Sequence, residues 1–164
     1  MSPVITRTFE LADAEATERV GRALAAALEG GMLVTLVGDL GAGKTTLARG
    51  MLRGLGHQGP VKSPTYAVVE HYQFSSLYLY HFDFYRFADP GEWETAGFSE
   101  YFRDDTLCIV EWPEKVDGLL PQADLSLALS MHDDAAPGRR LIARAATPAG
   151  ERALSTIPDS RAAG

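Results

Sequence analysis

The sequence has little of several things that would suggest secretion or a membrane. Its single cysteine, Cys108, cannot form an internal disulfide, and it lies in the apolar segment Leu107–Val110, so we expect a buried thiol in a reducing compartment. No apolar run approaches the roughly 18 residues that span a bilayer. The first ten residues, MSPVITRTFE, lack the basic start and apolar middle of a signal peptide. These absences predict a cytoplasmic protein with no membrane partner.

Basic residues are also fewer than acidic residues, which gives a formal net charge of −7. Binding of nucleic acid over the whole surface needs clustered Lys and Arg, so we expect any RNA to be met through a protein partner or a local basic patch. The length of 164 residues suits one compact domain with a sizeable core.

The first half of the chain predicts a helix, a buried strand and a second helix. Asp13 is a plausible N-cap for a helix that buries Val20, Leu24 and Leu28 and ends at Gly30-Gly31. The nearly continuous apolar run 32–37 is typical of a buried parallel strand. A second helix is expected over 44–55, with a core stripe at four-residue spacing.

The second half predicts mainly strands. Segments 67–73 and 77–84 suggest a hairpin, and Asp89, Pro90 and Glu92 have the pattern of a short helix start. Further strands are expected at 106–112, 123–131 and 139–147. We therefore predict an α/β fold, with a mostly parallel central sheet flanked by helices and antiparallel hairpin strands at one side. Residues 1–147 are expected to form a single domain, and 148–164 a partly mobile tail rich in Ala, Gly and Ser.

One motif after the first predicted strand indicates a phosphate site. The segment Gly38–Thr45 fits G-x-x-x-x-G-K-[ST], between an apolar strand and a helix as the motif requires. Glycines let backbone N–H groups converge on phosphate oxygens, the helix start favours the anion, Lys44 supplies positive charge, and the Thr45 hydroxyl binds Mg²⁺. A glycine-rich turn that fits by chance is the alternative. The residues expected to contact the nucleotide here are Asp39, Leu40, Gly41, Ala42, Gly43, Lys44, Thr45 and Thr46.

A metal-side acid is expected at the end of another buried strand. Glu111 comes directly after the apolar run 107–110, and in a P-loop protein such an acid holds a Mg²⁺-bound water or orients the attacking one. Taken alone, an acid in this position is an ordinary solvated boundary residue.

The residues after the loop narrow the class of P-loop protein. The sequence has no asparagine, so it lacks the N-K-x-D loop usual for GTP specificity, and it has no D-x-x-G beyond the P-loop. ATP is therefore the expected nucleotide. A small-molecule kinase needs basic residues for a second substrate, and Arg86, Arg103, Arg139 and Arg140 leave that possibility open.

Three further stretches carry a family resemblance. VKSPTYAVVEHY (61–72), YHFDFYRFADP (80–90) and CIVEWPEKV (108–116), together with the P-loop, resemble the bacterial TsaE family over about Phe9 to Arg144. Those proteins are small ATPases required for the threonylcarbamoyl modification of the adenosine next to the tRNA anticodon. The resemblance therefore implies the same activity here.

The resemblance also implies roles for particular residues. Thr65, in SPTY, would lie near the γ phosphate as in a switch loop, whereas the residues alone suggest an ordinary turn. Asp83 would face the site and position water or metal; without the family it would be an acid satisfied by Arg86 or a backbone donor. Trp112 would be tied to activity, covering the nucleotide or anchoring a partner, or else be simply a packed aromatic.

The resemblance implies that the adenine side lies around residues 11–13, including Asp13, and at Arg139, and an Arg can stack on a base. Arg139 taken alone would be a solvated hairpin residue.

The function implied is a Mg²⁺-dependent ATPase that does not itself transfer the threonylcarbamoyl group. Its partners would be the transferase subunit and its dimerising companion, and tRNA would be met only indirectly. A P-loop kinase of a small metabolite, or a nucleotide-dependent binding module without significant turnover, remain the alternatives.

Overall fold

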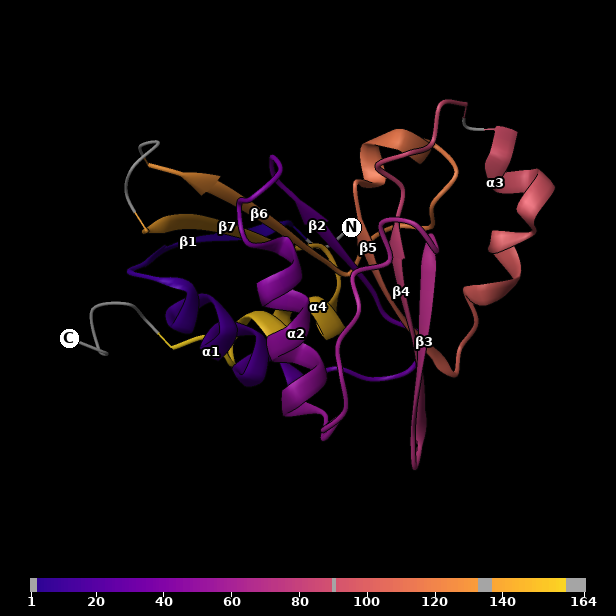
Figure 1. Cartoon of the computed structure of the whole chain (residues 1–164). Helices are drawn as coiled ribbons and strands as arrows, with labels where there is room; N and C mark the ends of the chain where they lie inside the picture. The colour runs from indigo at the N-terminus through magenta and orange to yellow at the C-terminus, as the bar shows by residue number, and fades with distance from the viewer. Residues whose placement is uncertain (1–2, 90, 133–136, 159–164) are drawn as a thin grey trace.

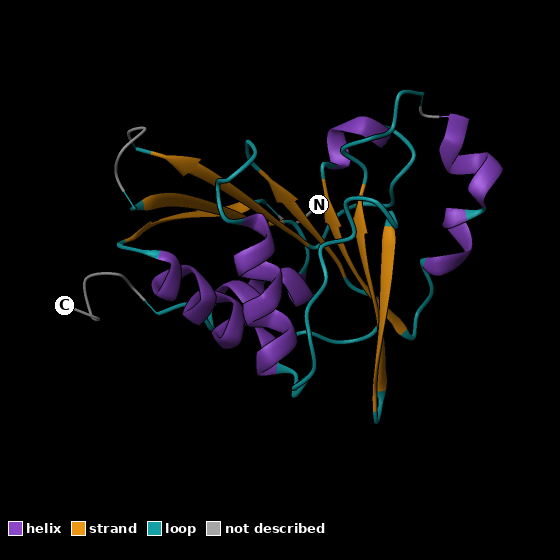
Figure 2. Ribbon diagram, viewed as in Figure 1, coloured by secondary structure: helices purple, strands orange, loops and turns teal. Residues whose placement is uncertain are grey.

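A seven-stranded sheet with helices on both faces forms the structure (Figures 1 and 2). The computed structural model describes residues 3–89, 91–132 and 137–158. Its strands are β1 (Ile5–Leu11), β2 (Leu33–Val37), β3 (Val69–Phe74), β4 (Leu77–Asp83), β5 (Thr106–Glu111), β6 (Leu125–Met131) and β7 (Arg139–Ala145). Its α-helices are α1 (Ala14–Ala25), α2 (Lys44–Gly54), α3 (Gly91–Ala96) and α4 (Pro148–Leu154), and its 3₁₀ helices are η1 (Phe98–Tyr101) and η2 (Pro113–Val116).

The strand order is β1-β7-β6-β2-β5-β4-β3. The central pairs β6–β2, β2–β5 and β5–β4 are parallel, and the remaining pairs, β1–β7, β7–β6 and β4–β3, are antiparallel. The predicted α/β class and the parallel centre are confirmed. Antiparallel pairing was expected on one side only, yet it occupies both edges, since β7 pairs antiparallel with β6 and β1, which was not predicted, pairs antiparallel with β7.

The two faces of the sheet bury separate cores. Helices α1, α2 and α4 cover one face, over side chains such as Leu36 and Ile109. Helix α3, η1 and η2 cover the other face, over an aromatic cluster that includes Phe82 and Phe84. Adjacent residues of β5 alternate between the cores, so a nearly unbroken apolar run is what a strand covered on both faces needs.

Helices α1 and α2 approach so closely that only glycine fits between them. A Cβ on Gly50 would lie 2.2 Å from the Glu18 carbonyl oxygen, and one on Gly21 would lie 2.4 Å from the Leu47 carbonyl oxygen. This contact fixes α2, the helix that begins at the phosphate motif, against the N-terminal helix. The predicted N-cap of α1 is confirmed, since the Asp13 carboxylate accepts a hydrogen bond of 2.8 Å from the Ala16 N–H.

The expected tail is wrong for residues 148–157. Thr147 caps α4 through a hydrogen bond from the Gly150 N–H, and Ala153, Leu154 and Ile157 are buried in the core. A Cβ on Gly150 would lie 1.8 Å from the Asp124 carbonyl oxygen, so this glycine permits close packing rather than flexibility. The end of the expected tail (159–164), together with Pro90 of the expected helix start, lies outside the described residues.

The expected helix start before α3 is supported by two described residues. The Asp89 carboxylate accepts from the Gly91 N–H at 2.9 Å, and the Glu92 carboxylate accepts from the Ala88 N–H at 3.2 Å. Among the described residues, none of the helices has the length and apolar character of a membrane span.

Candidate functional site

The phosphate motif forms the loop between β2 and α2, at the carboxyl edge of the parallel strands. Gly43, the last loop residue, has φ 108°, a left-handed conformation that favours glycine. Gly38 has φ 152°, and a Cβ there would lie 2.6 Å from the Leu129 carbonyl oxygen. Within the described residues, the N–H groups of Gly43, Lys44 and Thr45 have no protein acceptor, as expected for the first turn of a helix. They form a cluster of donors of the kind that binds an anion.

Lys44 is buried beneath the loop. Its ammonium donates to the Gly38 carbonyl oxygen and lies 3.8 Å from the centroid of the Trp112 ring. Burial lowers the pKa of Lys44, whereas the negative charges of Glu111 and Asp83 act in the opposite direction. A lysine held by one carbonyl and one ring face has donors left for an incoming oxyanion.

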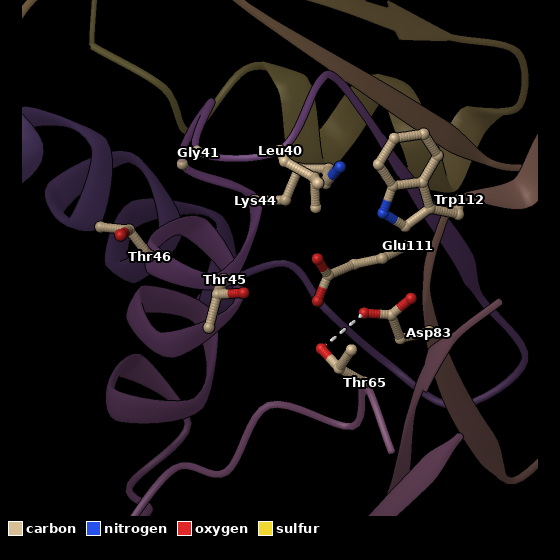
Figure 3. A pocket seen from close by; sticks show the side chains of 10 residues that line it. Leu40, Gly41, Lys44, Thr45, Thr46, Thr65, Asp83, Glu111 and Trp112 are labelled. Carbon is tan, nitrogen blue, oxygen red and sulfur yellow. Dashed lines mark hydrogen bonds between the residues drawn. The ribbon is translucent and has the colours of Figure 1, made fainter. Parts of the chain in front are cut away.

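Two carboxylates end neighbouring strands opposite the loop (Figure 3). Asp83 is the last residue of β4, Glu111 is the last of β5, and the two are register partners. The Asp83 carboxylate accepts 2.9 Å from the Tyr85 N–H and 3.2 Å from the Thr65 hydroxyl. Burial raises the pKa of Asp83 and the Glu111 charge raises it further, whereas its two donors oppose the shift. Figure 3 shows the Glu111 carboxylate pointing toward the hydroxyl of Thr45, and the Asp83 carboxylate facing the hydroxyl of Thr65.

A histidine that was not expected from the sequence holds Glu111. His81 Nε2 lies 2.6 Å from Glu111 Oε2, and both side chains are buried. The available signal was the alternation of a strand, because His81 and Asp83 are two residues apart and share one face of β4.

The segment that carries Thr65 is tied to β4 through a strained residue. Val68 has φ 70°, which is rare for a β-branched residue. Its N–H donates to the Pro64 carbonyl at 2.7 Å, and its carbonyl accepts from the Asp83 N–H at 2.9 Å. The Ser63 and Thr65 hydroxyls lie 2.7 Å apart. These bonds hold the Thr65 hydroxyl on the Asp83 carboxylate.

Trp112 also has a left-handed backbone, with φ 58° and ψ 49°. The chain turns here at the end of β5, which places the indole over Lys44 and 4.9 Å from the Tyr85 ring. The side chain therefore covers the lysine from the strand side of the site.

Ten residues line one cavity between the loop and the two acids (Figure 3). They are Leu40, Gly41, Gly43, Lys44, Thr45, Thr46, Thr65, Asp83, Glu111 and Trp112. The sequence motifs or the family resemblance singled out each of them. Four other candidates, Asp13, Asp39, Ala42 and Arg139, do not line it.

Two residues expected on the base side make structural hydrogen bonds. The Asp13 carboxylate caps α1. The Arg139 guanidinium donates to the Ala42 carbonyl at 3.1 Å and to the Gly41 carbonyl at 3.2 Å, so it braces the phosphate loop from β7.

The residues fit a magnesium nucleotide. The cavity combines helix-start N–H groups, a lysine, three threonines, two of them on α2, and two carboxylates. In the part of the chain that the structure describes, no group of three or more His, Cys, Asp or Glu could hold a metal by itself. Mg²⁺ suits such a sparse site, since it takes one or two protein oxygens and fills its octahedron with phosphate oxygens and water.

Comparison with known proteins places this site in a family. The family model described as "Threonylcarbamoyl adenosine biosynthesis protein TsaE" matches residues 11–141, which include every residue lining the cavity. The chain belongs to the TsaE family. The resemblance seen in the sequence motifs is thereby confirmed.

Individual TsaE proteins are similar over most of the chain. The tRNA threonylcarbamoyladenosine biosynthesis protein TsaE of Haemophilus influenzae is 55% identical over 107 residues, 65% of this chain and 68% of that protein. Its Bacillus subtilis counterpart is 40% identical over 120 residues, 73% of this chain and 75% of that protein. The crystal structure of Bacillus subtilis YdiB superposes with a TM-score of 0.79 at 29% identity, over 100% of both chains.

Proposed function

We propose that this TsaE protein is a Mg²⁺-dependent ATPase that acts in the cytoplasm in the biosynthesis of threonylcarbamoyladenosine in tRNA. The observation that carries the proposal is the cavity in which the phosphate loop, the Thr45 hydroxyl, and the Asp83 and Glu111 carboxylates converge. The family membership supplies the biosynthetic setting.

The loop and its lysine would bind the phosphates. Backbone N–H groups at the start of α2 offer donors without any side-chain movement. On nucleotide binding, the Lys44 ammonium would leave the Gly38 carbonyl oxygen and donate to a phosphate oxygen. The positive charge would then already be in place when the nucleotide arrives.

The acidic and hydroxyl side chains would bind the metal, orient the attacking water and sense the γ phosphate. Thr45 and Glu111 would hold Mg²⁺, which when bound neutralises charge on the phosphate oxygens. Asp83, with a pKa raised by burial, would orient the attacking water through its carboxylate. Thr65 hydrogen-bonds to Asp83, so a γ phosphate that attracts its hydroxyl would alter that bond and report the nucleotide state.

We further propose that the nucleotide state controls docking to the threonylcarbamoyl transferase subunit and its dimerising companion. ATP would favour the docked complex and hydrolysis would reset it between rounds. If the ATP-bound state binds the partners ten times more tightly, the difference in binding free energy is only about 1.4 kcal/mol. A few contacts of the segment that carries Thr65 (residues 62–68) can supply it. Contact with tRNA would then be indirect, in keeping with the net charge of −7.

The test is ATP hydrolysis by the purified protein, alone and with the transferase pair from the same organism. We expect slow turnover alone, stimulation by the pair, and loss of both in Lys44→Ala and Glu111→Ala. Asp105→Asn is the matched control, because this exposed acid lies at the opposite end of β5 and does not line the cavity. It should hydrolyse ATP like the wild type.

Two results would overturn the proposal. Turnover that ignores the pair and rises with a small-molecule acceptor would identify a kinase. Nucleotide-dependent binding to the pair without turnover, unchanged in Glu111→Ala, would identify a binding module.

A further inference from the structure

His81 is a buried polar residue to which the proposed function has given no task. It lies in β4 with no exposed surface, and its Nε2 is 2.6 Å from Glu111 Oε2. Its other ring nitrogen, Nδ1, has no hydrogen-bond partner among the described residues. Burial of a ring nitrogen without a hydrogen-bond partner costs free energy, which suggests that His81 is retained for the bond that its Nε2 makes to Glu111.

The proposed role of Glu111 sets the direction of this bond. An ionised carboxylate can only accept, so a Glu111 that binds Mg²⁺ as a carboxylate requires the proton on Nε2. Within the described residues, this is the only side-chain hydrogen bond that Glu111 makes, and it engages one of the two carboxylate oxygens. The other oxygen stays available on the side of the cavity, which Glu111 lines.

The surroundings of His81 keep it in place. Leu79, His81 and Asp83 alternate along one face of β4, and all three are buried. Since β4 pairs with β5 residue by residue, the imidazole and the Glu111 carboxylate are carried by adjacent hydrogen-bonded strands. The sheet therefore fixes the backbone of His81 relative to that of Glu111.

We propose that His81 is a positioning residue, which holds the Glu111 carboxylate through Nε2–H so that its second oxygen faces the metal position. The inference rests on the proposed function of Glu111. A glutamate has three rotatable side-chain bonds, and a single buried bond to one oxygen removes most of that freedom before the nucleotide arrives. Partners of this kind typically change metal affinity by about 10–100-fold when removed.

The test compares two amides at one position. The amide nitrogen of Gln occupies nearly the position of histidine Nε2, whereas that of Asn matches Nδ1, the nitrogen without a partner. We expect His81→Asn to raise the Mg²⁺ concentration needed for half-maximal ADP binding by about 10–100-fold, measured by calorimetry across a Mg²⁺ series. His81→Gln should stay within about threefold of the wild type, as should the control His71→Asn, at an exposed histidine of β3.

A second measurement needs no variant and no nucleotide. Long-range ¹H–¹⁵N correlation spectra of the wild-type protein should show the His81 proton on Nε2. A proton on Nδ1 alone would overturn the proposal, and so would an equal Mg²⁺ requirement in the wild type and in folded His81→Asn. Wild-type ADP binding that ignores Mg²⁺ would instead contradict the proposed function itself.

Discussion

Asp83 and Glu111 are register partners at the ends of the adjacent parallel strands β4 and β5. Their carboxylates are 5% and 3% exposed, so neighbouring negative charges are kept largely out of water. The Glu111 charge raises the pKa of Asp83 beyond the effect of burial, and both negative charges favour the charged form of Lys44. The fold thus maintains an acidic pair that a divalent cation entering the cavity would stabilise.

Asp83→Asn should stabilise the protein at neutral pH. Because burial raises the native pKa of Asp83, the wild type loses stability as pH rises from the ordinary value of 3.8 through the raised one, and the loss persists above it. The variant lacks this titration. Urea unfolding of both proteins from pH 4 to 8 should give a free-energy difference that grows with pH and then levels off. A difference that is constant across this range would contradict the raised pKa.

Gly50→Ala should destabilise the protein although alanine is the better helix former. The new methyl group would meet the backbone of α1 at Glu18, so the helices that hold the phosphate loop must separate. Overpacking of this kind costs about 1–3 kcal/mol. Denaturant unfolding measures the change, and the neighbouring Arg49→Ala should stay within about 0.5 kcal/mol of the wild type.

Leu154→Ala should lower the free energy of unfolding by about 2–5 kcal/mol, because it opens a cavity in a fully packed core. Ser155→Ala, one residue further at an exposed position, is the control and should change stability by about 0.5 kcal/mol or less. If the two variants were equally stable, α4 would not belong to the core.

The Cys108 thiol should be unreactive in the native protein. Burial raises its pKa to about 12, so almost no thiolate exists at pH 8, and the side chain is covered by the sheet and η1. Reaction with a disulfide reagent should be at least 100-fold slower than in urea, where the thiol returns to a pKa of about 8.5. Rapid labelling of native protein would contradict the burial.

Much of the fold could be predicted because its signals are local. The core strands are short apolar runs between turn residues, α1 has a clear N-cap, and both α1 and α2 have apolar stripes. One edge strand, β1, and one short helix, α4, were missed because their sequence patterns are weak. In β1 only Phe9 and Leu11 are buried, and α4 has 7 residues with a composition typical of a flexible segment. Tertiary packing makes them ordered, and a single sequence does not display that packing.

In the candidate site, too, residues with a local sequence signal could be predicted and residues that depend on tertiary contacts could not. The loop residues could be predicted from their spacing, because backbone geometry and phosphate chemistry require those residue types at those positions. Thr65 and Asp83 depended on the family resemblance. His81 was missed because strand alternation places it only on the face of Asp83, whereas its role depends on Glu111, 30 residues later, lying beside Asp83 on the adjacent strand. The hydrogen bonds from Arg139 to the loop carbonyls of Ala42 and Gly41 could not be predicted either, because no sequence pattern marks them.

The position of β2 has a consequence for synthesis on the ribosome. Both neighbours of β2 in the sheet, β5 and β6, come from the second half of the chain. When the phosphate motif emerges from the exit tunnel, the strand that leads into it has no partner on either edge. It acquires both only after residue 131 has been translated. The nascent chain must therefore carry an unpaired apolar strand through most of its synthesis, and nucleotide can bind a completed site only near the end of translation.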